Sequence, residues 1–171
     1  MLARIHSAAI LGVDAYPVQV EVDVSNGDTD FTIVGLPDVA VRESVRRVEA
    51  AVRNSGFEFP TGHRVTVNLA PADIRKEGPA FDLPIALGVV IATGQVAADD
   101  ILDEVAFTGE LSLDGRLRPI SGALPMALGC HKVGRRALIV PPANGNEAAV
   151  VDDFEVHPAE TLYDCVRLLE S

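Results

Sequence analysis

One stretch of the chain, residues 80–93, is almost entirely apolar and limits the fold more than any other feature. Between Ala80 and Thr93 only Asp82 and Thr93 are polar. A helix with an apolar surface all round has to be covered by other elements on every side. The stretch is shorter than the ~18 apolar residues that predict a membrane span, so we expect a helix inside a folded core. Pro84 fits within its first turn, where a missing N–H costs little.

Composition places the chain among single-domain globular proteins. Its 171 residues are enough for one hydrophobic core, and 48% are hydrophobic against 23% charged. Cys130 and Cys165 have no C-x-x-C spacing, and the first residues lack the charged start and apolar run of a secretory signal. Both features favour a reduced, cytoplasmic setting. The net charge of −11 repels phosphate backbones and argues against nucleic-acid binding by bulk electrostatics.

The first part of the chain shows a strand-like alternation followed by a helix-like spacing of apolar residues. Residues 18–24 alternate valine with polar side chains, which predicts a strand with one buried face. Residues 31–34 indicate the next strand, and the turn residues at 25–28 predict that the two strands pair as a hairpin. Asp38 is suited to cap a helix over residues 39–54, which has one valine stripe.

The later part alternates short strand and helix signals. An alternating segment, residues 107–113, precedes the turn Asp114-Gly115, and we expect a return strand over 116–120. Ser121 is suited to cap the following helix, which Gly134 closes. The remaining signals are strands at 65–69, 137–140 and 154–156 and an amphipathic helix at 162–169. We therefore expect residues 1–171 to form one compact α+β domain, with mixed sheets and hairpins packed against about four helices.

Motifs for phosphate and metal chemistry are missing. A P-loop needs Gly-Lys-Ser/Thr, but Lys76 is followed by glutamate and Lys132 by valine. The four histidines are scattered, and neither H-E-x-x-H nor a G-x-S-x-G elbow occurs. One acidic cluster lacks the glycine and spacing of a calcium loop, so we expect a solvated loop or helix start there: Asp99, Asp100, Asp103 and Glu104. The sequence thus predicts no cofactor and no metal in this chain.

Two segments resemble the proteolytic domain of Lon. Residues 76–82 (KEGPAFD) are similar to Lon's loop K-D-G-P-S-A-G. Residues 107–122 (FTGELSLDGRLRPISG) are similar to its T-G-E-I-T-L-x-G-x-V-x-P-I-G-G. The strand at 137–140 falls where Lon has the strand after its lysine-bearing helix. Since order and spacing agree, the resemblance implies a Lon proteolytic-domain-like fold from about residue 65 to 168.

The same resemblance locates the two positions at which Lon carries its catalytic serine and lysine. The serine position matches Ala80, and the lysine position matches Leu124 or its neighbour Pro125. A serine hydroxyl becomes a useful nucleophile only when a neighbouring base takes its proton. Because both positions are apolar, the resemblance implies a degenerate dyad, no catalytic residue and no peptidase activity.

Across the whole chain the similarity is greater to the N-terminal domain of the magnesium-chelatase-like AAA+ ATPases of the YifB/ComM type. Residues 31–44, 67–86 and the hairpin starting at 109–111 carry it. Members of that family place an AAA+ module after this domain, so the resemblance implies an excised N-terminal domain, with ATP and Mg²⁺ bound in the missing module. It also implies a cytoplasmic homo-hexamer, away from membranes, that acts as an ATP-driven DNA helicase or branch-migration factor in competence.

Three arginines on the predicted helix 39–54 are candidates for contacts with DNA or a neighbouring subunit. Arg42, Arg46 and Arg53 share one face at helical spacing. Glu43 and Glu49 lie in the same helix and are placed to pair with them, which favours an ordinary solvated face.

The loop before the apolar helix allows two interpretations. Arg75, Lys76 and Glu77 lie beside a glycine at the entrance to that helix, where Lon builds its active site. The loop is either a turn kept for its backbone geometry or a contact point for DNA, a partner subunit or the ATPase module. Asp82 is expected to stabilise the helix start electrostatically or to neutralise Arg75 or Lys76.

The leading hypothesis is a non-catalytic scaffold or interaction domain that contacts its own AAA+ module and neighbouring subunits. Two alternatives stay open. One is a peptidase with a displaced dyad, such as Ser121 with Lys132. The other is a subunit of a metal-chelatase-type complex on a tetrapyrrole pathway.

Overall fold

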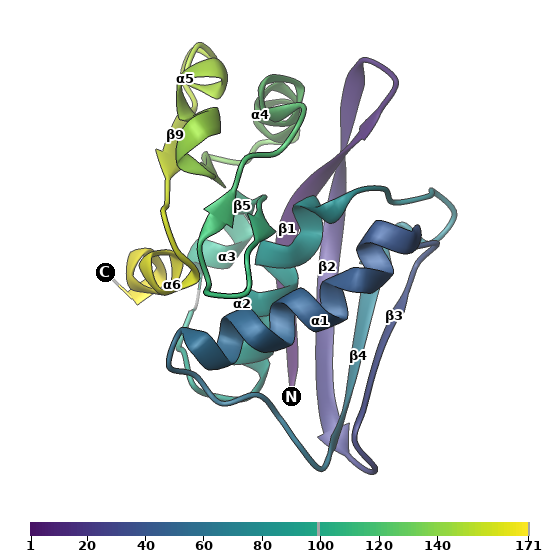
Figure 1. Ribbon diagram of the computed structural model, residues 1–171. Helices are drawn as coiled ribbons and strands as arrows, with labels where there is room; N and C mark the ends of the chain where they lie inside the picture. Colours follow the sequence, from purple (N-terminus) through teal and green to yellow (C-terminus); the bar gives the residue numbers. More distant parts are fainter. Residues whose placement is uncertain (99, 171) are drawn as a thin grey trace.

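A computed structural model describes residues 1–98 and 100–170, and its centre is a seven-stranded mixed sheet (Figure 1). The strand order is β3-β4-β2-β1-β5-β8-β9. These strands are β1 Leu2–Leu11, β2 Asp14–Asn26, β3 Asp30–Val34, β4 His63–Ala70, β5 Val105–Phe107, β8 Ala137–Val140 and β9 Glu155–Pro158. Strands β6 Glu110–Leu111 and β7 Leu117–Arg118 form a separate two-stranded sheet.

Helices and strands are mixed along the described chain, which confirms the α+β class. The helices are α1 Val39–Asn54, α2 Asp82–Ala92, α3 Ile101–Glu104, α4 Ala123–Lys132, α5 Gly145–Ala148 and α6 Leu162–Glu170, with 3₁₀ turns at Pro79–Phe81 and Pro142–Asn144. None of the helices described is long and apolar enough to cross a bilayer. Within the predicted acidic cluster, Asp99 lies outside the described residues, and Asp103 and Glu104 belong to α3.

The predicted helix over 39–54 and its cap are confirmed. The Asp38 carboxylate accepts a hydrogen bond from the Val41 backbone N–H at 2.8 Å, and Ser55 ends the helix. The predicted hairpin between residues 18–24 and 31–34 is wrong. β4 lies between β2 and β3, antiparallel to the first and parallel to the second. The turn residues after β2 do reverse the chain. The neighbour of β2 is nevertheless β4, because the β3–α1–β4 crossover places β4 parallel to β3 and between β3 and β2.

The actual hairpin is β1–β2, whose register runs from Leu2 opposite Asp23 to Leu11 opposite Asp14. β1 lies parallel to β5 and meets it in register at a single pair, His6 with Ala106. The upper part of the β1–β2 hairpin therefore extends beyond β5 (Figure 1).

The apolar stretch forms the central helix, as predicted. All 11 residues of α2 are buried, and the helix packs on β1 and β2 on one side and on α1 on the other. Strands β5 and β8 separate this core from a second one. Their residues Phe107 and Ile139 face the α2 side, whereas Ala106 and Leu138 face α4 and α5. The sheet is thus covered on both faces near β5 and β8.

Two local predictions in the second half are wrong. The segment 107–113 is not one strand: β5 ends at Phe107 in the large sheet, and β6 pairs with β7 instead. The break occurs because the Gly109 N–H and C=O bond to Ala80 and Leu83 rather than to a strand. Ser121 does not cap α4, because the cap position is Gly122 in the left-handed region (φ 82°).

Candidate functional site

A groove of about 620 Å³ surrounds the position that matches Lon's serine. It is lined by residues 8–10 of β1, by residues 77–81 and by residues 119–121. Ala80 lies half-buried in this groove. Leu124 packs against the apolar cluster of α4 and does not line the groove.

A buried lysine fixes the loop that forms one wall. Lys76 is 0% exposed, and its ammonium donates hydrogen bonds to the carbonyl oxygens of Gly35, at 2.9 Å, and Pro71. Its backbone N–H donates to the Leu36 carbonyl, and its own carbonyl accepts from the Asp38 N–H, both at 3.0 Å. The loop is therefore tied to the segment between β3 and α1 through both the side chain and the main chain of Lys76. Burial lowers the pKa of Lys76.

Two further bonds hold the same loop. The second Asp38 carboxylate oxygen accepts from the Gly78 N–H at 3.1 Å, while the first caps α1. The Tyr16 hydroxyl donates to the Arg75 carbonyl at 3.0 Å. Arg75 and Glu77 themselves point outward, 68% and 71% exposed, and form an ion pair at 3.5 Å. The loop is a rigid turn that presents these two side chains.

Asp82 does not neutralise Arg75 or Lys76, so both predicted partners are wrong. Its carboxylate is fully buried and receives the Arg47 guanidinium at 2.6 and 3.1 Å. The Ser44 hydroxyl donates to it at 2.5 Å and the Leu111 N–H at 3.0 Å. The predicted partners are unavailable because Lys76 is held by carbonyls and Arg75 faces solvent.

This network joins three elements: α1 contributes Ser44 and Arg47, α2 contributes Asp82, and β6 contributes Leu111. Burial raises the pKa of Asp82, and the bonds from Arg47, Ser44 and Leu111 oppose that rise. The hydrogen bond and charge of Asp82 raise the pKa of Arg47, against the effect of burial.

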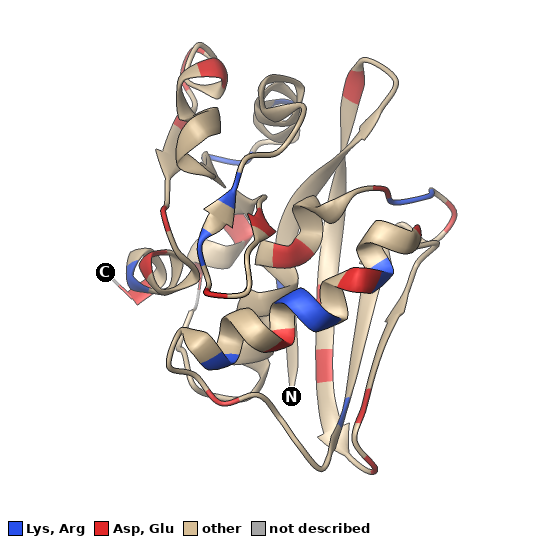
Figure 2. Ribbon diagram, viewed as in Figure 1, with Lys and Arg blue, Asp and Glu red and all other residues tan. Residues whose placement is uncertain are grey.

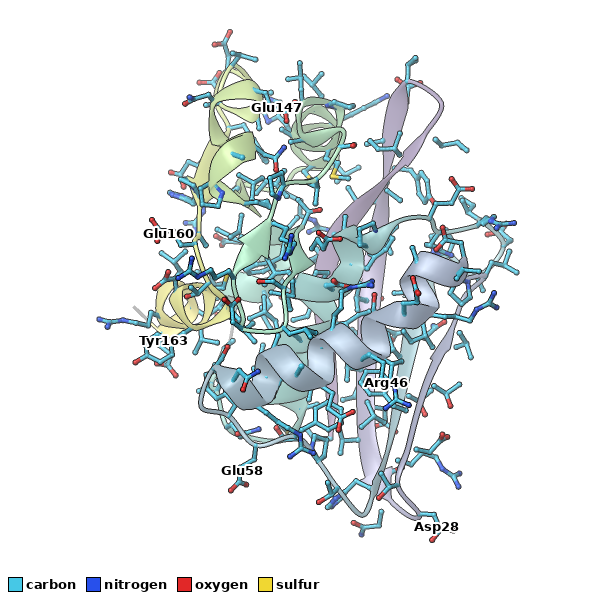
Figure 3. The ribbon with its side chains drawn as sticks, viewed as in Figure 1. Asp28, Arg46, Glu58, Glu147, Glu160 and Tyr163 are labelled. Carbon is cyan, nitrogen blue, oxygen red and sulfur yellow. The ribbon has the colours of Figure 1, made fainter. Side chains whose placement is uncertain are left out.

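The outer side of α1 carries the other arginines in a row of both charge signs (Figure 2). Arg53 pairs with Glu49 at 3.4 Å and lies over the Phe59 ring. Arg42 and Arg46 are exposed and have no ion pair within the described part of the chain; Arg46 projects outward (Figure 3). On the predicted solvated face, Arg53 therefore forms an ion pair, whereas Arg42 and Arg46, one turn apart, form none among the described residues.

The second wall of the groove is fixed by Asn144. Its buried amide accepts from the Ile120 N–H at 2.9 Å and donates to the Ile120 carbonyl at 2.8 Å. Ser121 follows at the groove, whereas Lys132 lies at the far end of α4 and lines a different pocket. A helix rises 1.5 Å per residue, so about 15 Å separates the two residues.

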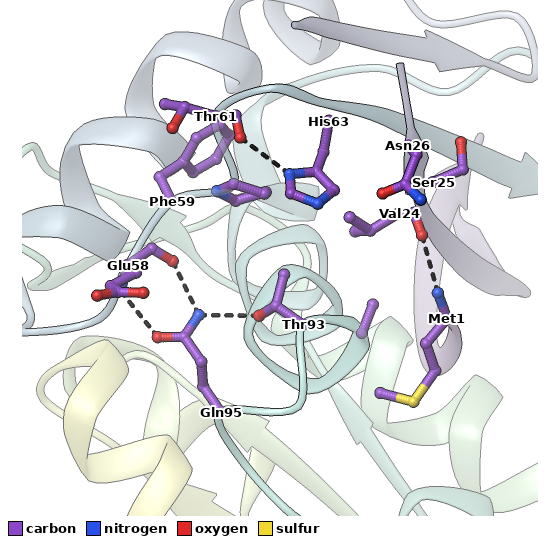
Figure 4. Close-up of a pocket in the computed structure, with 12 residues that line it drawn as sticks. Met1, Val24, Ser25, Asn26, Glu58, Phe59, Thr61, His63, Thr93 and Gln95 are labelled. Carbon is purple, nitrogen blue, oxygen red and sulfur yellow. Dashed lines mark hydrogen bonds between the residues drawn. The ribbon is translucent and has the colours of Figure 1, made fainter. Parts of the chain in front are cut away.

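A second pocket, of about 720 Å³, lies at the end of α2 and the β2–β4 pair (Figure 4). Its polar groups bond largely to one another. The Gln95 amide accepts from the Glu58 N–H and donates to the Glu58 carbonyl and the Thr93 hydroxyl, each at 2.8 Å. His63 bonds to the Thr61 carbonyl at 2.9 Å.

Sequence reasoning missed the roles of Arg47, Ser44 and Asn144. One signal was present, because Ser44 interrupts the apolar side of α1 with a polar side chain that has to find a buried partner. Nothing in the local pattern marked Asn144 as a clamp on Ile120, since the two are 24 residues apart.

Comparisons with known proteins show which family the chain resembles. The family model described as subunit ChlI of Mg-chelatase matches residues 20–144. Competence protein ComM of Haemophilus influenzae is 45% identical over 168 residues, 98% of this chain and 32% of its own length. YifB of Escherichia coli is 44% identical over 151 residues, 88% of this chain and 29% of its own.

A more distant similarity reaches Lon. A Lon protease of Chloroflexus aurantiacus is 34% identical over 132 residues, 73% of this chain and 16% of its own length. The chain thus spans about a third of the ComM and YifB relatives and a smaller part of Lon.

Proposed function

Because the chain belongs to the magnesium-chelatase-like family that includes ComM and YifB, we propose that it is a non-catalytic interaction domain of a larger AAA+ ATPase. The remaining length of such a protein would hold the ATPase module with its ATP and Mg²⁺. The domain would contact that module and neighbouring subunits of a cytoplasmic hexamer that acts on DNA. The ComM name supports a role in competence.

One observation supports the proposal: Ala80, which matches the position of Lon's serine, lines the groove and carries no nucleophile. Acyl transfer by a serine needs a base within hydrogen-bond reach. Among the described residues, the groove lining includes no lysine or histidine. Both Asp38 oxygens already accept backbone hydrogen bonds, and the Glu77 carboxylate forms an ion pair with Arg75. A displaced dyad of Ser121 and Lys132 is not supported either, because the two lie at opposite ends of α4.

Peptidase assays test the proposal. The purified chain is incubated with unfolded casein, beside the variants Ala80→Ser and Ser121→Ala. We expect no cleavage by any of the three, since a serine at position 80 would still lack a base. Cleavage that disappears in Ser121→Ala would overturn the proposal in favour of the displaced dyad.

A salt titration tests the DNA part of the proposal. Binding to single-stranded and branched DNA is measured from 20 to 200 mM salt, with Arg42→Ala, Arg46→Ala and Arg75→Ala beside the control Arg167→Ala. Given the net charge of −11, we expect binding only at low salt and only through the exposed α1 arginines. No binding at low salt would remove the DNA role and leave the assembly role.

A chelatase-type assembly is the second candidate, because the matching family is described as a Mg-chelatase subunit. Gene neighbourhood separates the two: tetrapyrrole genes next to this gene would favour chelation, and competence genes would favour DNA transformation.

A further inference from the structure

We propose that the groove beside Ala80 binds an extended peptide segment with a basic side chain, which adds as a strand to the free edge of β1 and is released uncut. This inference rests on the proposed function, since it names the kind of partner that an interaction domain would hold. Four features of the groove support it.

The first feature is an unpaired strand edge. β1 pairs with β2 along its whole length, but its other edge is in register with β5 only at His6. Beyond Ser7, whose hydroxyl bonds to the Phe107 carbonyl, residues 8–11 have no neighbouring strand on that side among the described residues. Every second residue of such an edge directs its N–H and C=O away from β2. Exposed edges of this kind accept an added strand.

The second feature is the position of the groove along this edge. Residues 8–10 and Gly12 line it directly, so a chain lying in the groove runs beside the free backbone groups. Four residues of strand span about 13 Å, which matches a peptide of about four residues. The small, half-buried side chain of Ala80 leaves room for a side chain of that peptide.

The third feature is rigidity. Five hydrogen bonds tie one wall to neighbouring segments: four involve Lys76, and one joins the Gly78 N–H to the Asp38 carboxylate. Asn144 holds Ile120 on the other wall. A preformed wall lowers the entropy lost when an extended peptide is bound.

The fourth feature is charge. Asp38 and Glu77 lie at the groove, and the lining that residues 1–98 and 100–170 provide contains no lysine, arginine or histidine. The Asp38 oxygens are occupied by backbone donors, whereas the Glu77 side chain is mostly exposed beside Arg75. A basic side chain of the peptide can replace Arg75 beside Glu77, and the two groove carboxylates repel phosphate, so a peptide with Arg or Lys fits this groove better than nucleic acid.

An array of random heptapeptides, probed with the fluorescently labelled chain, tests the inference. We expect selection of strand-forming peptides with one Arg or Lys, which mass spectrometry recovers intact. For a selected peptide, dissociation constants are measured by fluorescence polarisation, with and without N-methylation of alternate backbone amides. N-methylation on the pairing register should weaken binding at least tenfold, because it removes the strand hydrogen bonds.

Charge variants locate the binding site. Glu77→Lys should raise the dissociation constant of the basic peptide at least tenfold. The same variant should bind a second peptide, in which Glu replaces the basic residue. Glu58→Lys is the matched control: this carboxylate lines the other pocket, and the substitution should leave the dissociation constant unchanged.

Different results would contradict the peptide-binding inference and the proposed non-catalytic function. Absence of any bound heptapeptide, or binding insensitive to both N-methylation and Glu77→Lys, overturns the inference and leaves the proposed non-catalytic role in place. Cleavage of the bound peptide contradicts the non-catalytic role itself.

Discussion

Two buried charges, Lys76 and Asp82, hold the loops around the groove in different ways. In the described part of the chain the Lys76 ammonium hydrogen-bonds to two carbonyl oxygens, so it clamps two backbone segments together. Asp82 meets a guanidinium, a hydroxyl and a backbone N–H from two other elements. Removing one partner of a buried ion pair leaves an uncompensated charge, which costs far more than the pair contributes.

The substitution Arg47→Met tests how much the buried Asp82–Arg47 ion pair matters for stability. The substitution keeps most of the apolar stem but leaves the Asp82 carboxylate without its charged donor, and we expect the free energy of unfolding to fall by about 3 kcal/mol. Urea denaturation measures the change. Arg46→Met, on the exposed side of the same helix, is the control and should stay within about 0.5 kcal/mol of the parent. Equal effects of the two substitutions would contradict the account of Asp82.

At the scale of elements, α2 is the piece against which the others pack. It contacts β1, β2, α1 and α6, and it carries the groove loop at its N-terminal end. Its approach to the sheet is close: a Cβ added at Gly88 would lie 2.4 Å from a Val22 methyl group and 3.0 Å from the Val22 Cβ. Gly88 is therefore required by packing, although glycine is a poor helix former.

Gly88→Ala should destabilise the chain by about 1–3 kcal/mol, because overpacking outweighs the gain of about 1 kcal/mol in helix propensity. The matched control is Gly145→Ala in α5, where an added Cβ would meet Pro158 at an ordinary 3.7 Å. Thermal unfolding of both variants measures the difference. A stabilising effect of Gly88→Ala would show that α2 has room to move away from β2.

At the scale of the whole molecule, the sheet separates two apolar cores, and each contains one cysteine. Cys130 belongs to the core under α4, and Cys165 to the core around α2. Burial raises the pKa of each thiol from 9.0 to about 12. The pKa of each thiol therefore depends on whether the core around it is folded.

Between pH 9 and 12 the unfolded thiols have lost their protons while the folded ones retain them. The free energy of unfolding should therefore fall as pH rises above 9, by up to ~1.4 kcal/mol per pH unit for each thiol. Urea midpoints at pH 8, 9 and 10 measure this slope, and Cys130→Ala/Cys165→Ala should flatten it. The same slope in the double variant would mean that other groups cause the dependence.

Local patterns in the sequence determined much of the fold. The apolar run at 80–93, the valine alternation at 18–24 and the Asp38 cap each lead to the observed element, because periodicity and capping act within a few residues. The motifs at 76–82 and 107–122 likewise indicate the resemblance to Lon and the position of Ala80, and the segments 31–44 and 67–86 indicate the family. These signals depend on residues that are close together in the sequence, so they can be interpreted without the tertiary structure.

Only the tertiary structure decided how those elements meet. β4 separates β2 from β3, Asp82 takes Arg47 rather than Arg75 or Lys76, and Lys76 is buried against carbonyls. Each of these pairs joins residues that are distant in the chain, and several partners were chemically acceptable for each. The choice among them depends on how α1, α2 and the sheet pack together, because packing fixes which polar groups are buried side by side and must satisfy one another.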